Sequence, residues 1–453
     1  MNAIAQMGLT RALAAKAAAL RYKDIPDTVR AWARQCVLDY TACAVAGASD
    51  DLVAMLLAEM QEQGVEPVAA VLGRAERLPV LSAALVNGAA SHALDFDDVN
   101  LAVLGHPSVA ILPALLALAE ERGSSGADVL TAFVAGYELE CRVGRVIAPG
   151  HYDGLGFHAT STVGSFGAAA ACAHLLGLDT ERFAVALGIA GTQAAGLKSM
   201  FGTMCKPLHA GKAAYHGLLA ARLAARGFTS RTDVLECAQG FCATHSPDFH
   251  PERAAETPPG GWWILSNLFK YHASCYMTHA AIEAARTLRE RHGVVPEQVE
   301  RIELQIEESC DRICNIAAPR TGLEAKFSLR LTTAMGLAGV DTSRLSSYSE
   351  TIAADPVLIG LRDKVAFDFR SGIRNTFTET TVSLRDGSRV SARHDSGIPA
   401  TDDTEQGRRL EAKFVALVGP VLGADRTARL IAEIGQFDTL SDLRGLLALG
   451  AGA

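Results

Sequence analysis

Residues of catalytic type are concentrated in one short stretch of the chain, HALDFDDVNLAVLGHPS, at positions 92–108. Within a background of Leu, Val, Ala and Gly it carries five ionisable side chains: His92, Asp95, Asp97, Asp98 and His106. One interpretation is that a carboxylate points into a site, where it holds the tautomer of a histidine or transfers a proton, while the others brace the turn. The alternative is that all three aspartates are helix caps and surface acids.

Three segments place a basic residue next to an expected helix start. His106 precedes Pro107, Lys206 precedes Pro207, and a glycine-rich approach leads to His158. Proline suits the first helical position, and helix N-termini present free N–H groups and partial positive charge that attract carboxylates. The same field disfavours added positive charge and so helps to keep a base neutral. Any one of these residues alone would more often be structural, but the three together indicate a site for a carboxylate.

Other kinds of site find little support in the sequence. A magnesium–diphosphate site needs a second acidic cluster and several basic residues, and no convincing partner cluster is found. The phosphate-binding pattern GxxxxGK[ST], the GxSxG elbow and a GxGxxG after a strand are also missing from the sequence. We therefore expect no metal and no nucleotide cofactor.

Composition limits the partners and the compartment. Lys and Arg number 42 against 50 Asp and Glu, a net charge of −8, so nucleic acid is not expected as a partner. The ten cysteines form no CxxC pair and are interpreted as small buried side chains in a reducing compartment. No apolar run reaches the roughly 18–20 residues of a membrane span. We expect a cytoplasmic protein; a mitochondrial transit peptide, suggested by the lack of acidic residues before Asp24, ranks second.

The elements that must position these residues are mainly helices. Up to about residue 265 the sequence is rich in Ala, Leu and Gly with helical spacing, and the small-residue segment 160–178 suits the middle of a bundle. Strand patterns follow at 299–308 and 364–370, with a hairpin at 380–393, and helical texture returns from Asp403. The sequence predicts a mainly α protein: a large all-helical domain from both chain ends (1–268 and 403–453) and a smaller inserted α/β lid domain (269–402).

Five segments in order along the chain resemble the MmgE/PrpD family, which includes 2-methylcitrate dehydratase, cis-aconitate decarboxylase and iminodisuccinate epimerase. The resemblance implies the same two-domain architecture, a homodimer, and no metal or organic cofactor. The segments are DIPDTVRAWARQCVLDYTACAVAGA, NGAASHALDFDDVN with LGHPSVAILPALLALAE, HYDGLGFHATSTVGSFGAAAACAHLLGLD, GLKSMFGTMCKPLHAGKAAYHG and EAKFSLRLTTA.

By position, the resemblance also implies site residues. It implies five catalytic residues, Asp95, His106, Tyr152, His158 and Lys206, and two substrate-binding residues, His209 and Lys270. With Asp95 facing into the site, Asp97 and Asp98 are expected to brace the turn. Tyr152 matches the tyrosine that forms a two-base pair with the lysine at 206 in the epimerase. Two positions depart from the family pattern, because Val99, followed by Asn100, replaces a common threonine and Leu331 replaces a common tyrosine. Each change removes a hydroxyl, which argues against cis-aconitate decarboxylation and, less strongly, against methylcitrate dehydration.

The family reactions share the formation or quenching of a carbanion next to a carboxylate, which requires a neutral base and fixed positive potential. We expect a dehydratase-type lyase acting on a small di- or tricarboxylate. The alternative enzyme is an epimerase of an iminodisuccinate-like dicarboxylate that uses Tyr152 and Lys206. A third hypothesis is a non-catalytic polycarboxylate-binding protein.

Overall fold

The computed structural model describes residues 6–62 and 66–452, which form two compact units. One, here called the helical unit, comprises the residues up to Phe269 and those from Thr401 onward. The other, the α/β unit, runs from Lys270 to Ala400. The protein is mainly α, as the sequence predicts. That the α/β unit acts as a lid stays a prediction.

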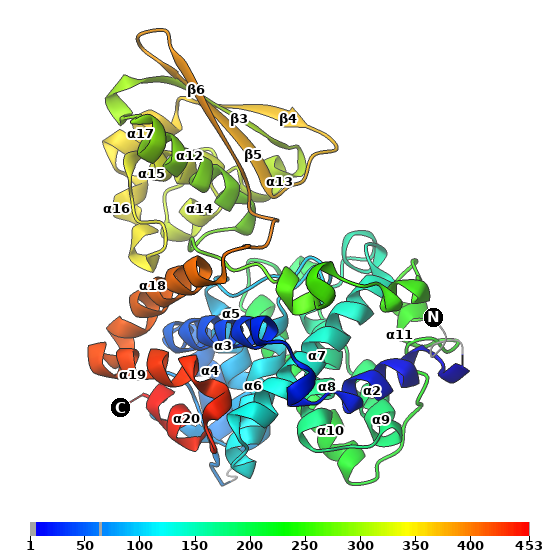
Figure 1. Cartoon of the computed structure of the whole chain (residues 1–453). Helices are drawn as coiled ribbons and strands as arrows, with labels where there is room; N and C mark the ends of the chain where they lie inside the picture. Colours follow the sequence, from blue (N-terminus) through cyan, green and yellow to red (C-terminus); the bar gives the residue numbers. More distant parts are fainter. Residues whose placement is uncertain (1–5, 63–65, 453) are drawn as a thin grey trace. The chain divides into compact units, whose positions relative to one another are not determined.

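The helical unit is a bundle around α8 (Ala159–Leu175), which packs against α6 (Pro107–Arg122), α7 (Gly126–Ile147), α9 (Thr180–Gly191) and α10 (Cys205–Ala225) (Figure 1). Its other elements are α2 (Leu9–Ala19), α3 (Asp27–Gly47), α4 (Asp51–Gln61), α5 (Val80–Ala93), α11 (Phe241–His245), α18 (Asp403–Leu422), α19 (Ala424–Gly435), α20 (Arg444–Gly450) and the short strands β1 (Ala69–Ala70) and β2 (Arg77–Leu78).

Small side chains let α8 lie close to its neighbours. A Cβ atom on Gly167 would stand 2.1 Å from Oε2 of Glu140 on α7, and one on Gly217 of α10 would stand 2.4 Å from the Cβ of Ala168. The predicted central position of this helix is therefore confirmed. One predicted boundary shifts: α10 begins at Cys205, two residues before the proline expected to start it.

The two ends of the chain meet in the helical unit. Helices α18 and α19 pack on α3. There Lys413 of α18 and Asp39 of α3 form a buried ion pair, with the ammonium nitrogen 2.6 Å from the carboxylate oxygen. The same ammonium donates to the backbone oxygen of Phe96, at 2.6 Å, in the turn that carries the aspartates. The C-terminal segment thus supports the turn.

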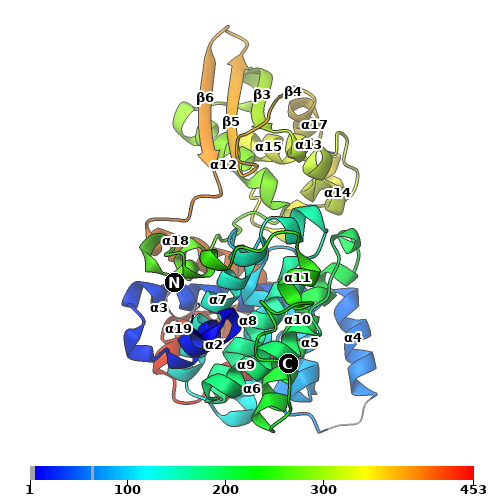
Figure 2. The same cartoon turned by 90° about the vertical axis from the view of Figure 1, so that its right-hand side faces the viewer.

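The α/β unit contains a four-stranded sheet in the order β4 (Val365–Arg370), β3 (Val299–Glu307), β5 (Phe377–Leu384), β6 (Arg389–Asp395). β3 pairs with β4 in parallel and with β5 antiparallel, and the predicted hairpin β5–β6 turns at Gly387. Helix α12 (His279–His292) packs on β5 and β6 and against α15 (Leu329–Ala338) (Figure 2). The remaining helices are α13 (Ser309–Cys314), α14 (Gly322–Lys326), α16 (Glu350–Ala353) and α17 (Pro356–Arg362).

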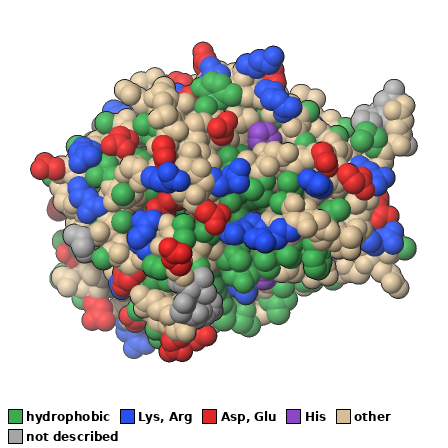
Figure 3. Space-filling view, turned by 90° about the horizontal axis from the view of Figure 1, so that it is seen from below, with side chains coloured by type: hydrophobic (Ala, Val, Ile, Leu, Met, Phe, Trp, Pro, Cys, Tyr) green, Lys and Arg blue, Asp and Glu red, His purple; other side chains and the backbone are tan. Residues whose placement is uncertain are grey.

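On the face that Figure 3 shows, acidic and basic side chains are interspersed around apolar groups and form no large basic patch. Within residues 6–62 and 66–452, no single helix has the length and apolarity to cross a membrane; the pair α3 and α4, bent by 85°, passes that test by length and composition only. None of the ten cysteines forms a disulfide, and seven are buried. Cys205, next to Lys206, is exposed, unlike the buried position expected for cysteines in this chain.

Candidate active site

Four helix ends bring the predicted residues together in the helical unit. His92 lies in the last turn of α5, His106 is the N-cap of α6, and His158 is the N-cap of α8. Lys206 and His209 lie in the first turns of α10. Helices α5, α6, α8 and α10 pack against one another. Three helix N-termini therefore contribute to one site, as the sequence predicts, and direct their partial positive charge to it.

The turn between α5 and α6 is held in a fixed conformation. Asp95 has a positive φ of 52°, which redirects the chain directly after the helix. The backbone N–H of Val99 donates to the oxygen of Leu268 at 2.8 Å. The side-chain amide of Asn100 donates to the hydroxyl of Tyr137 at 3.0 Å and to the backbone oxygen of Trp263 at 3.1 Å. Asn100 is therefore an anchor of the turn.

Asp97 is shared by two histidines. Its carboxylate oxygens lie 2.9 and 3.0 Å from Nδ1 of His92, and Oδ2 lies 2.8 Å from Nδ1 of His106. An ionised carboxylate only accepts hydrogen bonds, so His92 carries its proton on Nδ1. Nδ1 of His106 contacts the same carboxylate without the alignment of a hydrogen bond, and we expect its proton on that atom as well. Their Nε2 atoms are then left as proton acceptors. Nε2 of His92 is buried and has no hydrogen-bonding partner in the described part of the chain.

The electrostatics of this group keep the carboxylate charged and His92 neutral. Burial alone would raise the pKa of Asp97, but the charges and hydrogen bonds of His92 and His106 lower it well below its usual range. Burial lowers the pKa of His92 to about 4, against the opposing influence of Asp97. At neutral pH the arrangement therefore combines an anionic Asp97 with an uncharged His92.

His158 and His209 form a second histidine pair. Their Nδ1 atoms lie 3.0 Å apart, so one donates and the other accepts. The ring of His158 stacks on that of His92, with centroids 5.8 Å apart, and meets the edge of Phe201 at 4.9 Å. Burial, followed by the nearby positive groups, lowers the pKa of His158 well below its usual range, and burial with Lys206 lowers that of His209. Both are neutral at physiological pH.

The cation of the site is accessible to solvent. The ammonium of Lys206 lies 2.6 Å from a carboxylate oxygen of Asp95, and the two side chains are 16% and 33% exposed. His106 is 13% exposed, whereas Asp97 is fully buried. A ligand entering from solvent would therefore meet the Asp95–Lys206 ion pair and His106 before it could reach Asp97.

Asp98 lies behind this group. Its Oδ2 accepts hydrogen bonds from the hydroxyl of Ser108 and, at 2.9 Å, from the amide of Asn267, while Oδ1 has no hydrogen-bonding partner among the described residues. Burial and the negative charge of Asp39 raise the pKa of Asp98 to about 7. Asp98 thus braces the turn, as the sequence interpretation expects.

The structure also shows an arrangement that the sequence analysis did not expect. His92, Asp95, Asp97 and His106 each offer one potential ligand atom, and these atoms lie within 4.8 Å of one another, which would suit a metal ion. The search for a second acidic cluster missed this group because two of its members are histidines. The ammonium of Lys206 already neutralises Asp95 and would repel a divalent cation there.

The structure changes the roles expected within the turn. Asp95 faces Lys206, and it is Asp97, expected to brace the turn, that orients the histidines. His92, Asp97 and Phe201 were missed as site residues. His92 and Asp97, five residues apart across a helix end, were a usable signal, whereas Phe201 was marked only by standing shortly before Lys206 in the chain.

The two other predicted residues are Tyr152 and Lys270. The ring of Tyr152 lies under Lys198, whose ammonium is 3.6 Å from the ring centroid. Lys198 also donates to the backbone oxygen of Tyr152 at 3.1 Å. Lys270 is a buried residue of the α/β unit. Pairing of Tyr152 with Lys206 and substrate binding by Lys270 stay predictions.

Comparisons with known proteins cover most of the chain. The family models described as MmgE/PrpD N-terminal domain and MmgE/PrpD C-terminal domain match residues 11–254 and 272–438. Cis-aconitate decarboxylase of Homo sapiens is 30% identical over 97% of this chain and 94% of its own length. The Mus musculus enzyme is 28% identical over 97% and 93%, and that of Aspergillus terreus 27% identical over 98% and 96%.

Proposed function

The chain belongs to the MmgE/PrpD family, and from that premise we propose that it is a cofactor-independent lyase acting on a small di- or tricarboxylate. The observation that carries the proposal is the Asp97 carboxylate shared by His92 and His106, beside the Lys206 ammonium. It supplies an oriented neutral base next to a fixed positive charge, the two requirements for removing a proton adjacent to a carboxylate.

We assign proton abstraction to Nε2 of His106, whose side chain solvent reaches. The C–H bond breaks, the proton passes to Nε2, and the electron pair spreads into the neighbouring substrate carboxylate. Asp97 stabilises the imidazolium that forms, as the carboxylate of an Asp–His pair does. Lys206 offsets the developing enolate charge. The departing hydroxyl takes the proton held on Nε2 of His106 and leaves as water, which returns the base to its neutral form.

Loss of a β-hydroxyl as water is the outcome we propose first. Val99 and Leu331 are buried apolar side chains at positions where the family commonly has hydroxyls, and the loss of those hydroxyls argues more strongly against decarboxylation than against dehydration. Decarboxylation is the second candidate, because relatives that align over 97% and 98% of the chain are cis-aconitate decarboxylases. Epimerisation would require a second acid or base on the opposite face of the substrate, the role expected of Tyr152 with Lys206.

One experiment tests the proposal and separates these outcomes. The protein is incubated in D₂O with 2-methylcitrate, citrate, cis-aconitate and iminodisuccinate, and exchange and products are followed by NMR. New alkene signals without loss of carbon support dehydration, release of CO₂ supports decarboxylation, and exchange without net product supports epimerisation. Neither exchange nor product with any compound, in a protein that binds one of them, would refute the catalytic proposal and favour a binding protein.

Lys206→Ala should abolish exchange and turnover. The matched control is Lys212→Ala, which removes the same side chain from the same helix, where the Lys212 ammonium lies over the ring of Tyr215. Full activity of Lys206→Ala would remove the cation from the mechanism.

We also propose that the protein is a homodimer, which light scattering of the purified protein would test by giving its mass directly. We further propose a cytoplasmic location, which subcellular fractionation would test.

A further inference from the structure

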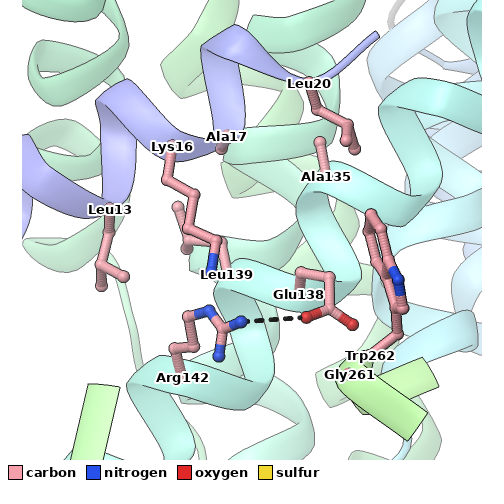
Figure 4. A pocket seen from close by; sticks show the side chains of 10 residues that line it. All are labelled: Leu13, Lys16, Ala17, Leu20, Ala135, Glu138, Leu139, Arg142, Gly261 and Trp262. Carbon is pink, nitrogen blue, oxygen red and sulfur yellow. Dashed lines mark hydrogen bonds and ion pairs between the residues drawn. The ribbon is translucent and has the colours of Figure 1, made fainter. Parts of the chain in front are cut away.

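A pocket in the helical unit lies between α2, α7 and the segment around Trp262 (Figure 4). Its volume is about 130 Å³. Charged side chains meet there: the Lys16 amine from α2 and the Glu138 carboxylate and Arg142 guanidinium from α7 point toward one another. Leu13, Leu20 and Trp262 supply apolar walls. None of these residues belongs to the His92–Asp97–His106 group.

The charges of the pocket do not balance. Lys16 and Arg142 are cationic and Glu138 is the one carboxylate of the lining, so one positive charge remains. Arg142 is only 4% exposed and is paired with Glu138 over 3.3 Å. Its Nε has no hydrogen-bonding partner in the described residues. A buried guanidinium with an unused donor is unfavourable, and one anionic group would satisfy it.

The size and the walls define the rest of the ligand. An apolar cavity of about 150 Å³ accommodates benzene, so this pocket, at about 130 Å³, takes at most one small ring, with the carboxylate of the ligand next to the charged side chains. The single uncompensated charge fits a monocarboxylate, whereas the proposed substrates carry two or three carboxylates. Carboxylate oxygens suit the forked donors of arginine, and an apolar body would pack against Trp262 and the leucines.

Hydrogen bonds connect this pocket to the turn at the candidate active site. Glu138 accepts from the backbone N–H of Ile264 at 3.2 Å. The backbone oxygen of the preceding Trp263 accepts from Asn100 at 3.1 Å, and Asn267 bonds Asp98 at 2.9 Å. A ligand that draws Arg142 away from Glu138 would therefore act on the segment that anchors the turn.

We propose that this pocket is an effector site for a small monocarboxylate with a compact apolar body, and that its occupancy is transmitted to the 97–106 turn. The probe is benzoate, measured by calorimetry and by tryptophan fluorescence on the full chain. We expect saturable binding with a dissociation constant on the order of 1 mM, given the small number of ligand atoms. Benzamide, which lacks the charge, should bind at least about 5-fold more weakly.

Variants locate the binding. Lys16→Met, at an exposed position, should weaken benzoate binding by about 5-fold, and Trp262→Phe should remove the fluorescence change. Lys23→Met, an exposed lysine outside the pocket lining, is the matched control and should bind as the parent does. Failure of benzoate to bind would show that solvent satisfies Arg142, and unchanged binding by Lys16→Met would place the ligand elsewhere. Either result overturns the proposal.

Hydrogen–deuterium exchange tests the transmission without any substrate, so its outcome does not depend on the proposed lyase activity. Benzoate should slow exchange in peptides covering 94–106 and 262–268 in the parent protein but not in Lys16→Met. Binding without any change in these peptides would refute the effector role.

Discussion

The substitution Asp97→Asn tests the central feature of the candidate site. Asparagine keeps the size of the side chain but replaces one carboxylate oxygen by an NH₂ group. That group donates, and facing Nδ1 of a histidine it favours the tautomer with the proton on Nε2. The histidine then presents a donor, where the proposed reaction needs an acceptor. Asp97→Asn should therefore lose the base while the fold is kept.

The structure sets the size of the effect. General base catalysis contributes about 10²–10⁴ in rate, so kcat should fall by that factor. Asp97 makes charge-assisted contacts with His92 and His106, each worth about 1.5–3 kcal/mol, and Asn retains one acceptor. The free energy of unfolding should therefore decrease by about 2–3 kcal/mol. Turnover and solvent exchange of the substrate proton measure the first effect, and denaturant titration measures the second.

Asp98→Asn is the matched control, because it makes the same chemical change in the adjacent residue. Asn keeps an oxygen to accept from Ser108 and Asn267, so kcat should change by less than about threefold. The pKa of Asp98 is raised from 3.8 to about 7, so the native state holds a proton that the unfolded chain releases between these values. The parent protein therefore loses stability as the pH rises from about 4 to 7, by up to about 4 kcal/mol.

Asp98→Asn lacks this loss. The melting temperature of Asp98→Asn minus that of the parent should therefore increase with pH. It should be larger at about pH 8 than at about pH 5, and most of the increase should fall between about pH 4 and 7. The reasoning would be refuted if Asp98→Asn lost activity as severely as Asp97→Asn, or if Asp97→Asn kept parental turnover while remaining folded.

Three further predictions concern other parts of the molecule. The ring of Phe201 is 39% exposed and meets that of His158 edge to face. Phe201→Ala should raise KM or lower kcat by about 10-fold, with less than about 1 kcal/mol of destabilisation. Phe201→Leu should recover part of the activity, and parental kinetics for Phe201→Ala would exclude this residue from the site. Treatment with EDTA followed by dialysis should leave turnover unchanged, because the Lys206 ammonium neutralises Asp95 and so opposes binding of a divalent cation there. Activity lost with EDTA and restored by a divalent metal would show that His92, Asp95, Asp97 and His106 form a metal site. Gly217→Ala, whose new Cβ would lie 2.4 Å from the Cβ of Ala168 and 2.6 Å from the backbone nitrogen of Ala169, should lower the free energy of unfolding by about 1–3 kcal/mol in a denaturant titration. An unchanged midpoint would contradict the close packing of α8 and α10.

The sequence predicted those features that local chemistry determines. Prolines and glycines marked the helix starts near Pro107 and Ala159, alternating apolar residues marked β3, and Asp386–Gly387 marked the β5–β6 turn. These signals depend on only a few neighbouring residues, so they predict helix starts, strands and turns without knowledge of the tertiary contacts. The grouping of His106, His158 and Lys206 followed from their shared position at helix starts and from the family resemblance, which also added Asp95.

The sequence could not assign the three aspartates of the turn. Their roles depend on the backbone direction after α5, where Asp95 takes a positive φ and so turns Asp97 toward His92. They also depend on distant partners: Lys413 reaches the turn from more than 300 positions along the chain, and Asn267 reaches Asp98 from 169. Sequence spacing carries no information about such contacts. The role of Asn100 depends on distant contacts in the same way. The sequence marked it as part of a departure from the family pattern, whereas the structure shows that its side chain anchors the turn by hydrogen bonds to Tyr137 and Trp263.

The two adjacent buried aspartates of the turn have different roles because their neighbours differ. Asp97 and Asp98 are adjacent and both fully buried, yet their pKa values move in opposite directions, because Asp97 faces two imidazoles and Asp98 faces the carboxylate of Asp39. One carboxylate is therefore held as an anion that orients the histidines. The other is stable in its protonated form and can bond Ser108 without adding negative charge next to an anionic substrate. Two adjacent charged carboxylates would repel that substrate. The raised pKa of Asp98 therefore leaves Asp97 as the charged carboxylate of this pair, beside the oriented histidines and the solvent-accessible ammonium of Lys206.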